Sequence, residues 1–196
     1  MPLIVAEFYA KDRTAWRTWL EKNHAKAERI QLILYKKGAS KTSVTYAEAV
    51  EEALCFGWID SKPTKRDEES YGLLFTERKP KSVWSKINKG RITELFKQGK
   101  MTDFGLAKIE RAKLDGSWEA LDEIEELIMP PALQKAFKGS NVALTNFNNF
   151  PSSVKKGIYQ WIVSAKTEQT LEKRVAETVE KAAENIRANQ WKPSTK

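Results

Sequence analysis

The segment Phe-Thr-Glu-Arg-Lys-Pro-Lys-Ser-Val-Trp-Ser-Lys-Ile-Asn-Lys-Gly-Arg-Ile-Thr-Glu-Leu-Phe (residues 75–96) begins as a strand, passes through Pro80 and continues as an amphipathic helix. From Arg78 to Lys100 there are eight basic residues and a single acidic one, Glu94. The local excess of positive charge nearly equals the net charge of +8 of all 196 residues. We therefore expect the functional surface of the protein to lie at this junction of strand and helix.

Two more strands are predicted before this junction. Residues 30–35 and 58–60 are rich in the aromatic and β-branched residues of strands, and residues 70–76 lead into the junction itself. Together they predict a small, mostly antiparallel sheet of about three strands. A sheet of this size needs helices on one face to bury its apolar side chains.

The predicted helices begin and end at recognisable capping residues. Asp12 can cap a first helix, and Thr45 with Glu48 forms a capping box for a helix at residues 46–56. That helix ends at Gly57, where a left-handed backbone conformation is expected. The fold class that follows is α+β.

The C-terminal half is predicted to be helical. Helices are expected at residues 83–98, from Thr102 to near Gly116, after Pro151, and from about residue 167 to 188, whereas the Asn-rich stretch 139–151 resembles a loop. The predicted organisation is an α+β region at 1–100, a helical region at 101–190 packed on it or forming a subdomain, and a flexible tail at 191–196.

Composition indicates the class of protein and its compartment. The N-terminus has no basic region before its apolar run, so we do not expect a signal peptide. No window of the sequence is apolar enough for a transmembrane segment. The single cysteine, Cys55, excludes an internal disulfide and suits a reducing compartment. We expect a cytoplasmic protein whose positive charge favours anionic partners.

The usual catalytic and metal-binding patterns are missing from the sequence. A helical projection places Cys55 on the side of Glu48, Glu51 and Glu52, where carboxylates raise a thiol pKa rather than lower it. With one histidine, His24, and one cysteine, a zinc site of the usual kind cannot be assembled. No Gly-x-Ser-x-Gly turn, phosphate-binding glycine loop or metalloprotease motif occurs. We predict no metal, no cofactor and no catalytic residue.

The helix predicted at 83–98 carries polar residues inside its apolar arc. Trp84 lies with Ile92, Leu95 and Phe96 on that arc, and Ser85 and Asn88 lie within it. Two interpretations remain open: Ser85 and Asn88 form a structural network at the start of the helix, or they face a pocket together with Trp84.

Asp60 and Arg78 extend the second interpretation, since a carboxylate and a guanidinium from neighbouring strands can pair in a bidentate geometry. Such a pair would serve as a structural clamp or as the wall of a pocket. The candidate pocket is therefore formed by Trp58, Asp60, Arg78, Trp84, Ser85 and Asn88, with Arg78 receiving an anionic or carboxylate group.

The central part of the chain resembles a known family. The matching residues, in order, are Leu34–Lys37, Ala49–Asp60, Phe75-Thr76 with Arg78 and Pro80, Trp84–Asn88, Gly99–Thr102 and Gly105-Leu106. They resemble the YdeI/OmpD-associated family, also called bacteriocin-protection proteins, from about Trp16 to the final helix. Glu77 stands where that pattern has proline.

The resemblance implies a link to bacteriocin protection, porin association or antimicrobial-peptide resistance, without a cofactor or agreed catalytic residues. It favours a binding or interaction protein of bacterial stress or resistance type, whose partner is a small anionic ligand or a protein. One alternative is a nucleic-acid binder that uses Lys79, Lys81, Lys86, Lys89 and Arg91 as phosphate contacts. A further alternative is an enzyme that acts through Asp60.

Overall fold

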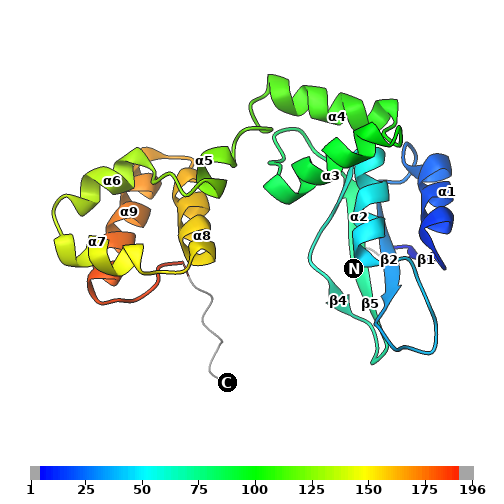
Figure 1. The fold of residues 1–196 in the computed structure, drawn as a ribbon, viewed down its shortest axis with the longest axis horizontal. Coiled ribbons are helices and arrows are strands. Elements are labelled where there is room, and N and C mark those ends of the chain that lie inside the picture. Colours follow the sequence, from blue (N-terminus) through cyan, green and yellow to red (C-terminus); the bar gives the residue numbers. More distant parts are fainter. Residues whose placement is uncertain (1–4, 190–196) are drawn as a thin grey trace. The chain divides into compact units, whose positions relative to one another are not determined.

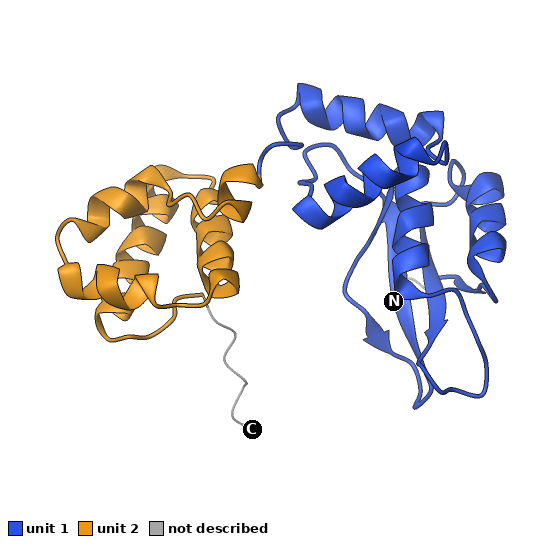
Figure 2. Cartoon of the chain, in the orientation of Figure 1, with its two compact units in different colours: residues 1–120 blue, residues 121–196 orange. Residues whose placement is uncertain are grey.

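The computed structural model of the chain describes residues 5–189 and forms two compact units, residues 1–120 and residues 121–196 (Figures 1 and 2). Strands and four helices make up the first unit, and the second unit is helical. The predicted α+β class is confirmed. The boundary expected at residue 100 falls inside the first unit, and the predicted tail at 191–196 lies outside the described residues.

The sheet of the first unit is mixed. Its strands are β1 (Glu7–Tyr9), β2 (Arg29–Tyr35), β3 (Trp58–Asp60), β4 (Thr64–Lys65) and β5 (Ser70–Glu77). The order is β1-β2-β5-β3, with β4 also paired to β5; β1 runs parallel to β2, and the other pairs are antiparallel. The three predicted strands are present, and the short strands β1 and β4 extend the sheet.

One face of this sheet carries the apolar core. The β2–β5 register pairs Ile30 with Phe75 and Leu32 with Leu73, and all four side chains are buried in one cluster. Alternate residues of a strand point to opposite faces, so this pairing places the apolar residues of both strands on the same side. Trp16 packs into the same cluster, 5.3 Å between ring centroids from Phe75.

The first unit also contains four helices among its described residues: α1 (Arg13–Asn23), α2 (Tyr46–Cys55), α3 (Lys86–Lys97) and α4 (Asp103–Leu114). Asp12 and Thr45 cap the first two, and Glu48 completes the expected capping box. Gly57 follows α2 with φ +71°, as predicted. A Cβ at Gly57 would lie 2.6 Å from Cγ of Lys108, so α4 approaches this turn closely.

Helix α2 contains a buried carboxylate, that of Glu52. Glu52 is only 1% exposed and pairs with two arginines of α1. The Arg13 Nε–Glu52 Oε1 distance is 2.5 Å and the Arg17 Nη1–Glu52 Oε2 distance is 2.7 Å. The two arginines of α1 supply the opposite charge that a buried carboxylate requires.

Cys55, on the same helix, is buried as well. Burial raises the pKa of its thiol to about 11, and the charge of Glu52 adds to this effect while Arg17 opposes it. The direction agrees with the expectation from neighbouring carboxylates, but burial is the main cause. A protonated, enclosed thiol has the reverse of the environment that activates a nucleophile.

The second unit contains helices α5 (Asp122–Glu125), α6 (Pro131–Phe137), α7 (Asn141–Asn148), α8 (Ser152–Val163) and α9 (Glu168–Ala183). Their core includes Leu133, Phe137, Ala143, Phe147, Ile158, Ile162, Val175 and Ala182. Among residues 5–189, no helix combines the length and apolar character that crossing a membrane requires.

Helix α7 corrects the prediction of a loop at 139–151. Asparagine is a weak helix former, so the sequence favoured irregular structure. The helix forms because Ala143 and Phe147 are fully buried, with the Phe147 ring centroid 5.1 Å from that of Phe137. Ser140 caps it by accepting a hydrogen bond from the backbone N–H of Ala143. Tertiary burial therefore outweighs local propensity here.

The buried carboxylate of α2 gives a test of the first core. We expect Glu52→Ala to lower the free energy of unfolding by about 3 kcal/mol, because two arginines lose the charge they surround. The adjacent Glu51→Ala is the matched control: it removes a half-buried contact with Arg13 only, and should lower stability by less than about 1 kcal/mol. Urea unfolding measures both, and equal losses would contradict this assignment.

The pKa of Cys55 predicts a pH dependence of stability. A thiol with a higher pKa in the folded state stabilises the fold below its unfolded pKa of about 8.5, and this contribution is lost as pH rises toward 11. Between pH 8 and pH 10 we expect Cys55 to account for a loss of about 2 kcal/mol. Cys55→Ala should show a correspondingly flatter profile in urea unfolding, whereas parallel profiles would refute the shift.

Candidate functional site

Arg78 is the centre of the candidate site. It follows the last residue of β5, and its backbone N–H donates to the carbonyl of Gly57 at 2.9 Å. The side chain is buried, with 3% of the residue exposed. Its guanidinium lies over the indole of Trp84, with Cζ 3.6 Å from the ring centroid, which is a close cation–π contact.

The two edges of this guanidinium have different environments. Nη1 donates to the carbonyl of Val83 at 3.0 Å and to Oγ of Ser82 at 3.3 Å. Nε and Nη2 are buried and have no hydrogen-bond acceptor among the described residues, and the same is true of Nε1 of Trp84. Because Nε and Nη2 share one edge, they form a free fork that matches the two oxygens of a carboxylate or phosphate.

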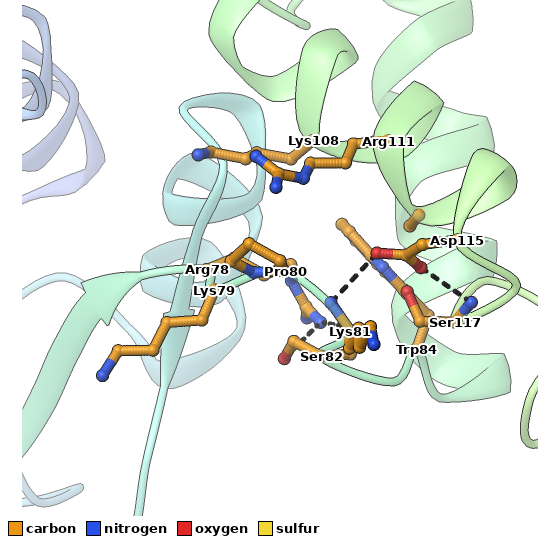
Figure 3. Close-up of a pocket in the computed structure, with 11 residues that line it drawn as sticks. Arg78, Lys79, Pro80, Lys81, Ser82, Trp84, Lys108, Arg111, Asp115 and Ser117 are labelled. Atoms are coloured by element: carbon orange, nitrogen blue, oxygen red, sulfur yellow. Dashed lines mark hydrogen bonds between the residues drawn. The ribbon is translucent and has the colours of Figure 1, made fainter.

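Asp115 fixes the segment that carries Arg78 relative to the end of α4 (Figure 3). Its carboxylate accepts hydrogen bonds from the backbone N–H groups of Lys81 and Ser117, each at 3.0 Å. Contacts with Ser117 and with Lys81 hold the pKa of Asp115 below its usual value, so it is ionised at neutral pH. Lys81 adopts φ +60° where it donates this bond.

Two connected spaces surround Arg78. The inner one is a cavity of about 10 Å³ that Arg78, Trp84, Asp115 and Ser117 help to line, and it is large enough for one water-sized atom. The outer one is a groove of about 680 Å³. Its lining residues are Glu28, Arg29, Thr76, Glu77, Arg78, Lys79, Pro80, Lys108 and Arg111, five of which also line the inner cavity.

The outer groove is electropositive. Lys108 is neutralised by Glu77, with an Nζ–Oε1 distance of 2.5 Å. Arg29, Lys79 and Arg111 make no side-chain hydrogen bond or ion pair with any described residue. Burial lowers the pKa of Arg78 to about 10, which leaves it charged at neutral pH. The arrangement can therefore bind an oxyanion through Arg78 and screen its charge with the surrounding cations.

The structure brings together two of the six predicted pocket residues, Arg78 and Trp84. Asp60 makes no ion pair with Arg78, in contrast to the prediction; it accepts a hydrogen bond from the Tyr46 hydroxyl at 3.0 Å. The register explains the separation: Asp60 lies opposite Phe75, three residues before Arg78 on the same strand, which corresponds to about 10 Å. Asp60 acts on Arg78 only as a distant charge that raises its pKa slightly.

Trp58, Ser85 and Asn88 lie away from both spaces. Trp58 is buried, donates from Nε1 to the carbonyl of His24 and packs edge-on against Trp19. Ser85 caps α3 by accepting from the backbone N–H of Asn88. These contacts place Trp58 in the core and make Ser85 and Asn88 the structural network that was one of the two open interpretations.

The residues of the nucleic-acid alternative are divided between two elements. Lys79 and Lys81 lie in the segment after β5, whereas Lys86, Lys89 and Arg91 belong to α3. Arg91 donates to Oδ1 of Asn88 at 3.0 Å, and Nζ of Lys89 lies 5.2 Å from the centroid of the Trp118 ring. The nucleic-acid function stays a prediction.

Sequence reasoning missed the wall of the site that α4 provides. Lys108 and Arg111 are three residues apart and therefore share a helix face, which is the one signal that the sequence contains. Nothing local indicates that this face lies opposite Arg78. As for metals, the described part of the chain contains no group of three or more His, Cys, Asp or Glu side chains suited to hold an ion.

Two family models match the chain. Residues 8–108, slightly more than half of it, match a family described as domain of unknown function DUF8412. Residues 126–185 match the family described as bacteriocin-protection, YdeI or OmpD-associated, which confirms the predicted resemblance. The motifs at 49–60 and 75–88 lie within the first match. No curated protein and no solved structure matches the chain.

The position of Ser85 gives a test that separates capping from ligand binding. Replacing an N-cap serine by alanine removes one acceptor at the start of the helix, so we expect Ser85→Ala to lower the free energy of unfolding by about 1 kcal/mol. Stabilisation of the protein by added oxyanions should stay as in the wild type. Loss of that stabilisation, measured by thermal unfolding, would instead place Ser85 in the site.

Proposed function

The chain belongs to the DUF8412 family and carries a bacteriocin-protection, YdeI or OmpD-associated region at 126–185, and from this premise we propose that it is a cytoplasmic binding protein whose N-terminal unit binds an oxyanion at Arg78. Binding, rather than catalysis, is the function that the chemistry of the site supports best. The single cysteine, which suits a reducing compartment, supports the cytoplasmic location.

The free edge of the Arg78 guanidinium carries this proposal. A buried donor without an acceptor lowers stability by about 1 to 3 kcal/mol, and more when the group is charged. Here Nε and Nη2 of Arg78 are both in this condition, and Nε1 of Trp84 is a third unpaired donor in contact with them. Buried polar groups of native proteins nearly always have a hydrogen-bond partner, so three such donors at one place indicate a position for bound water or a ligand.

The contacts that hold the Arg78 side chain in place support the same conclusion. Stacking on Trp84 and the bonds from Nη1 to Val83 and Ser82 fix the plane and the rotation of the guanidinium. The orientation of Nε and Nη2 is therefore set before any ligand arrives, which reduces the entropy lost on binding. A water molecule in the inner cavity can accept hydrogen bonds from Arg78 but leaves its charge uncompensated.

The family description names bacteriocin protection, and a binding function is compatible with that role. A protein that captures an anionic compound, or the anionic group of a protein partner, needs a preformed site and no catalytic residue. Arg78 and its groove meet this requirement within the first unit alone. Fractionation of the cells that naturally produce the protein tests the cytoplasmic location. Recovery of the protein from the cell envelope would contradict this part of the proposal.

Arg78→Lys tests the site directly. Lysine keeps the positive charge but has no fork, so we expect oxyanion affinity to fall at least about tenfold. The measurement is the rise in unfolding temperature with increasing sodium sulfate or phosphate, against sodium chloride at equal ionic strength. A specific ligand stabilises the native state in proportion to the logarithm of its concentration above Kd.

Lys86→Ala is the control for Arg78→Lys, because Lys86 is an exposed residue of α3 outside both spaces. It should respond to the anions as the wild type does. Equal stabilisation of the wild type and Arg78→Lys would contradict the proposed site, and so would the absence of any anion effect beyond that of chloride.

A further inference from the structure

The cations around the groove exceed what a single negative charge requires. Arg78 lies at its buried end, and Arg111 and Lys79 are exposed at its rim. Figure 3 shows Arg111 extending from α4 toward the segment that carries Arg78 and Lys79. None of the three forms an ion pair with a carboxylate among the described residues, although the charge of Arg111 adds to the hydrogen bonds that lower the pKa of Asp115. The groove lining includes five cations and two carboxylates, and this net charge of +3 would still be +2 with one carboxylate bound.

The acidic residues nearby are already engaged or lie outside this group of cations. Glu77 neutralises Lys108, and Asp115 is engaged by two backbone N–H groups. Asp115 lines the inner cavity but not the outer groove. The negative charge of Asp115 therefore disfavours the binding of an anionic oxygen inside the inner cavity. Of the two carboxylates that line the groove, Glu77 and Glu28, only the exposed Glu28 makes no hydrogen bond or ion pair with a described residue.

The dimensions of the two spaces decide where an anion can sit. A cavity of about 10 Å³ accepts a single oxygen atom and excludes a complete tetrahedral or carboxylate group. The groove, at about 680 Å³, has the size of a small-molecule site. A bound group larger than one atom must therefore lie in the groove, where Arg78, Lys79 and Arg111 are among the lining residues.

From these observations we infer that the ligand is a phosphate monoester that lies in the groove, with its dianionic phosphoryl group bound at Arg78 and Arg111 and its organic part along the rest of the lining. The inference rests on the proposed oxyanion site and adds the charge and the chemical class of the ligand. A phosphoryl dianion supplies three acceptor oxygens, two for the fork of Arg78 and one for Arg111. Arg29 lies at the other part of the groove, available to a polar group of the ester.

Phenyl phosphate and phenyl sulfate provide a matched pair of probes. They have nearly the same shape, but the phosphate carries two charges at neutral pH and the sulfate carries one. At pH 7.5, isothermal titration calorimetry should show that phenyl phosphate binds at least about tenfold more tightly. Benzoate, the carboxylate of similar size, should bind no better than phenyl sulfate.

The pH dependence distinguishes charge from shape. The second pKa of a phosphate ester is about 6, so the advantage of phenyl phosphate should decrease toward pH 5, while phenyl sulfate binding stays constant. The charged groups that face the ligand are Arg29, Arg78, Lys79, Arg111, the Glu77–Lys108 pair, Glu28 and, from the cavity, Asp115 and Lys81. No histidine, the side chain that ordinarily titrates between pH 5 and 8, is among them.

Arg111→Met tests the second arginine. It should reduce the ratio of phenyl phosphate to phenyl sulfate affinity at least about fivefold and leave phenyl sulfate binding nearly unchanged. Lys97→Met, which removes the same charge from a surface pair with Glu94 on α3, should leave the ratio as in the wild type.

The outcomes separate this inference from the proposed function. If phenyl sulfate or benzoate binds as tightly as phenyl phosphate at pH 7.5, and Arg78→Lys abolishes that binding, the phosphate inference is overturned while the oxyanion site stands. An unchanged ratio in Arg111→Met also overturns the inference. If none of the three probes binds, both the inference and the proposed site fail.

Discussion

The close approach of α4 to the end of α2 is the constraint on which the candidate site depends. Gly57 has φ +71°, and a Cβ there would lie 2.6 Å from Cγ of Lys108. A Cβ at Gly105 would lie 2.3 Å from the carbonyl oxygen of the last residue of α2. Neither position can accept a side chain without displacing α4. Because the helix lies this close, Lys108 and Arg111 line the same groove as Arg78.

Among the described residues of the first unit, two charged side chains are buried, and they are stabilised in opposite ways. Glu52 is matched by Arg13 and Arg17, so its charge is compensated within the fold, as a structural ion cluster requires. Arg78 has an aromatic partner and two carbonyl or hydroxyl acceptors on one edge, but no carboxylate and no acceptor on the other. The contrast between a completed cluster and an incomplete one separates structure from function more clearly than burial or charge alone.

Particular residues show how far sequence reasoning reached into the site. Arg78 and Trp84 were identified because a cation after a strand and an aromatic residue at the start of a helix stand out in a basic segment. Asp60 was assigned to the same place because neighbouring strands bring residues together, but the register, which no local pattern contains, put it about 10 Å away. Asp115 and Arg111 were missed because their relation to Arg78 exists only after α4 has packed.

The amino-acid sequence by itself determined the α+β class, the three main strands, the capped helices and the left-handed turn at Gly57, since each depends on side chains close together in the chain. The pocket predicted from the sequence also included Arg78 and Trp84, which the structure brings into contact. The tertiary structure decided which face of α2 is buried, that residues 141–148 form a helix, and which side chains surround Arg78. These outcomes depend on contacts between distant segments, where burial and strand register outweigh local preference.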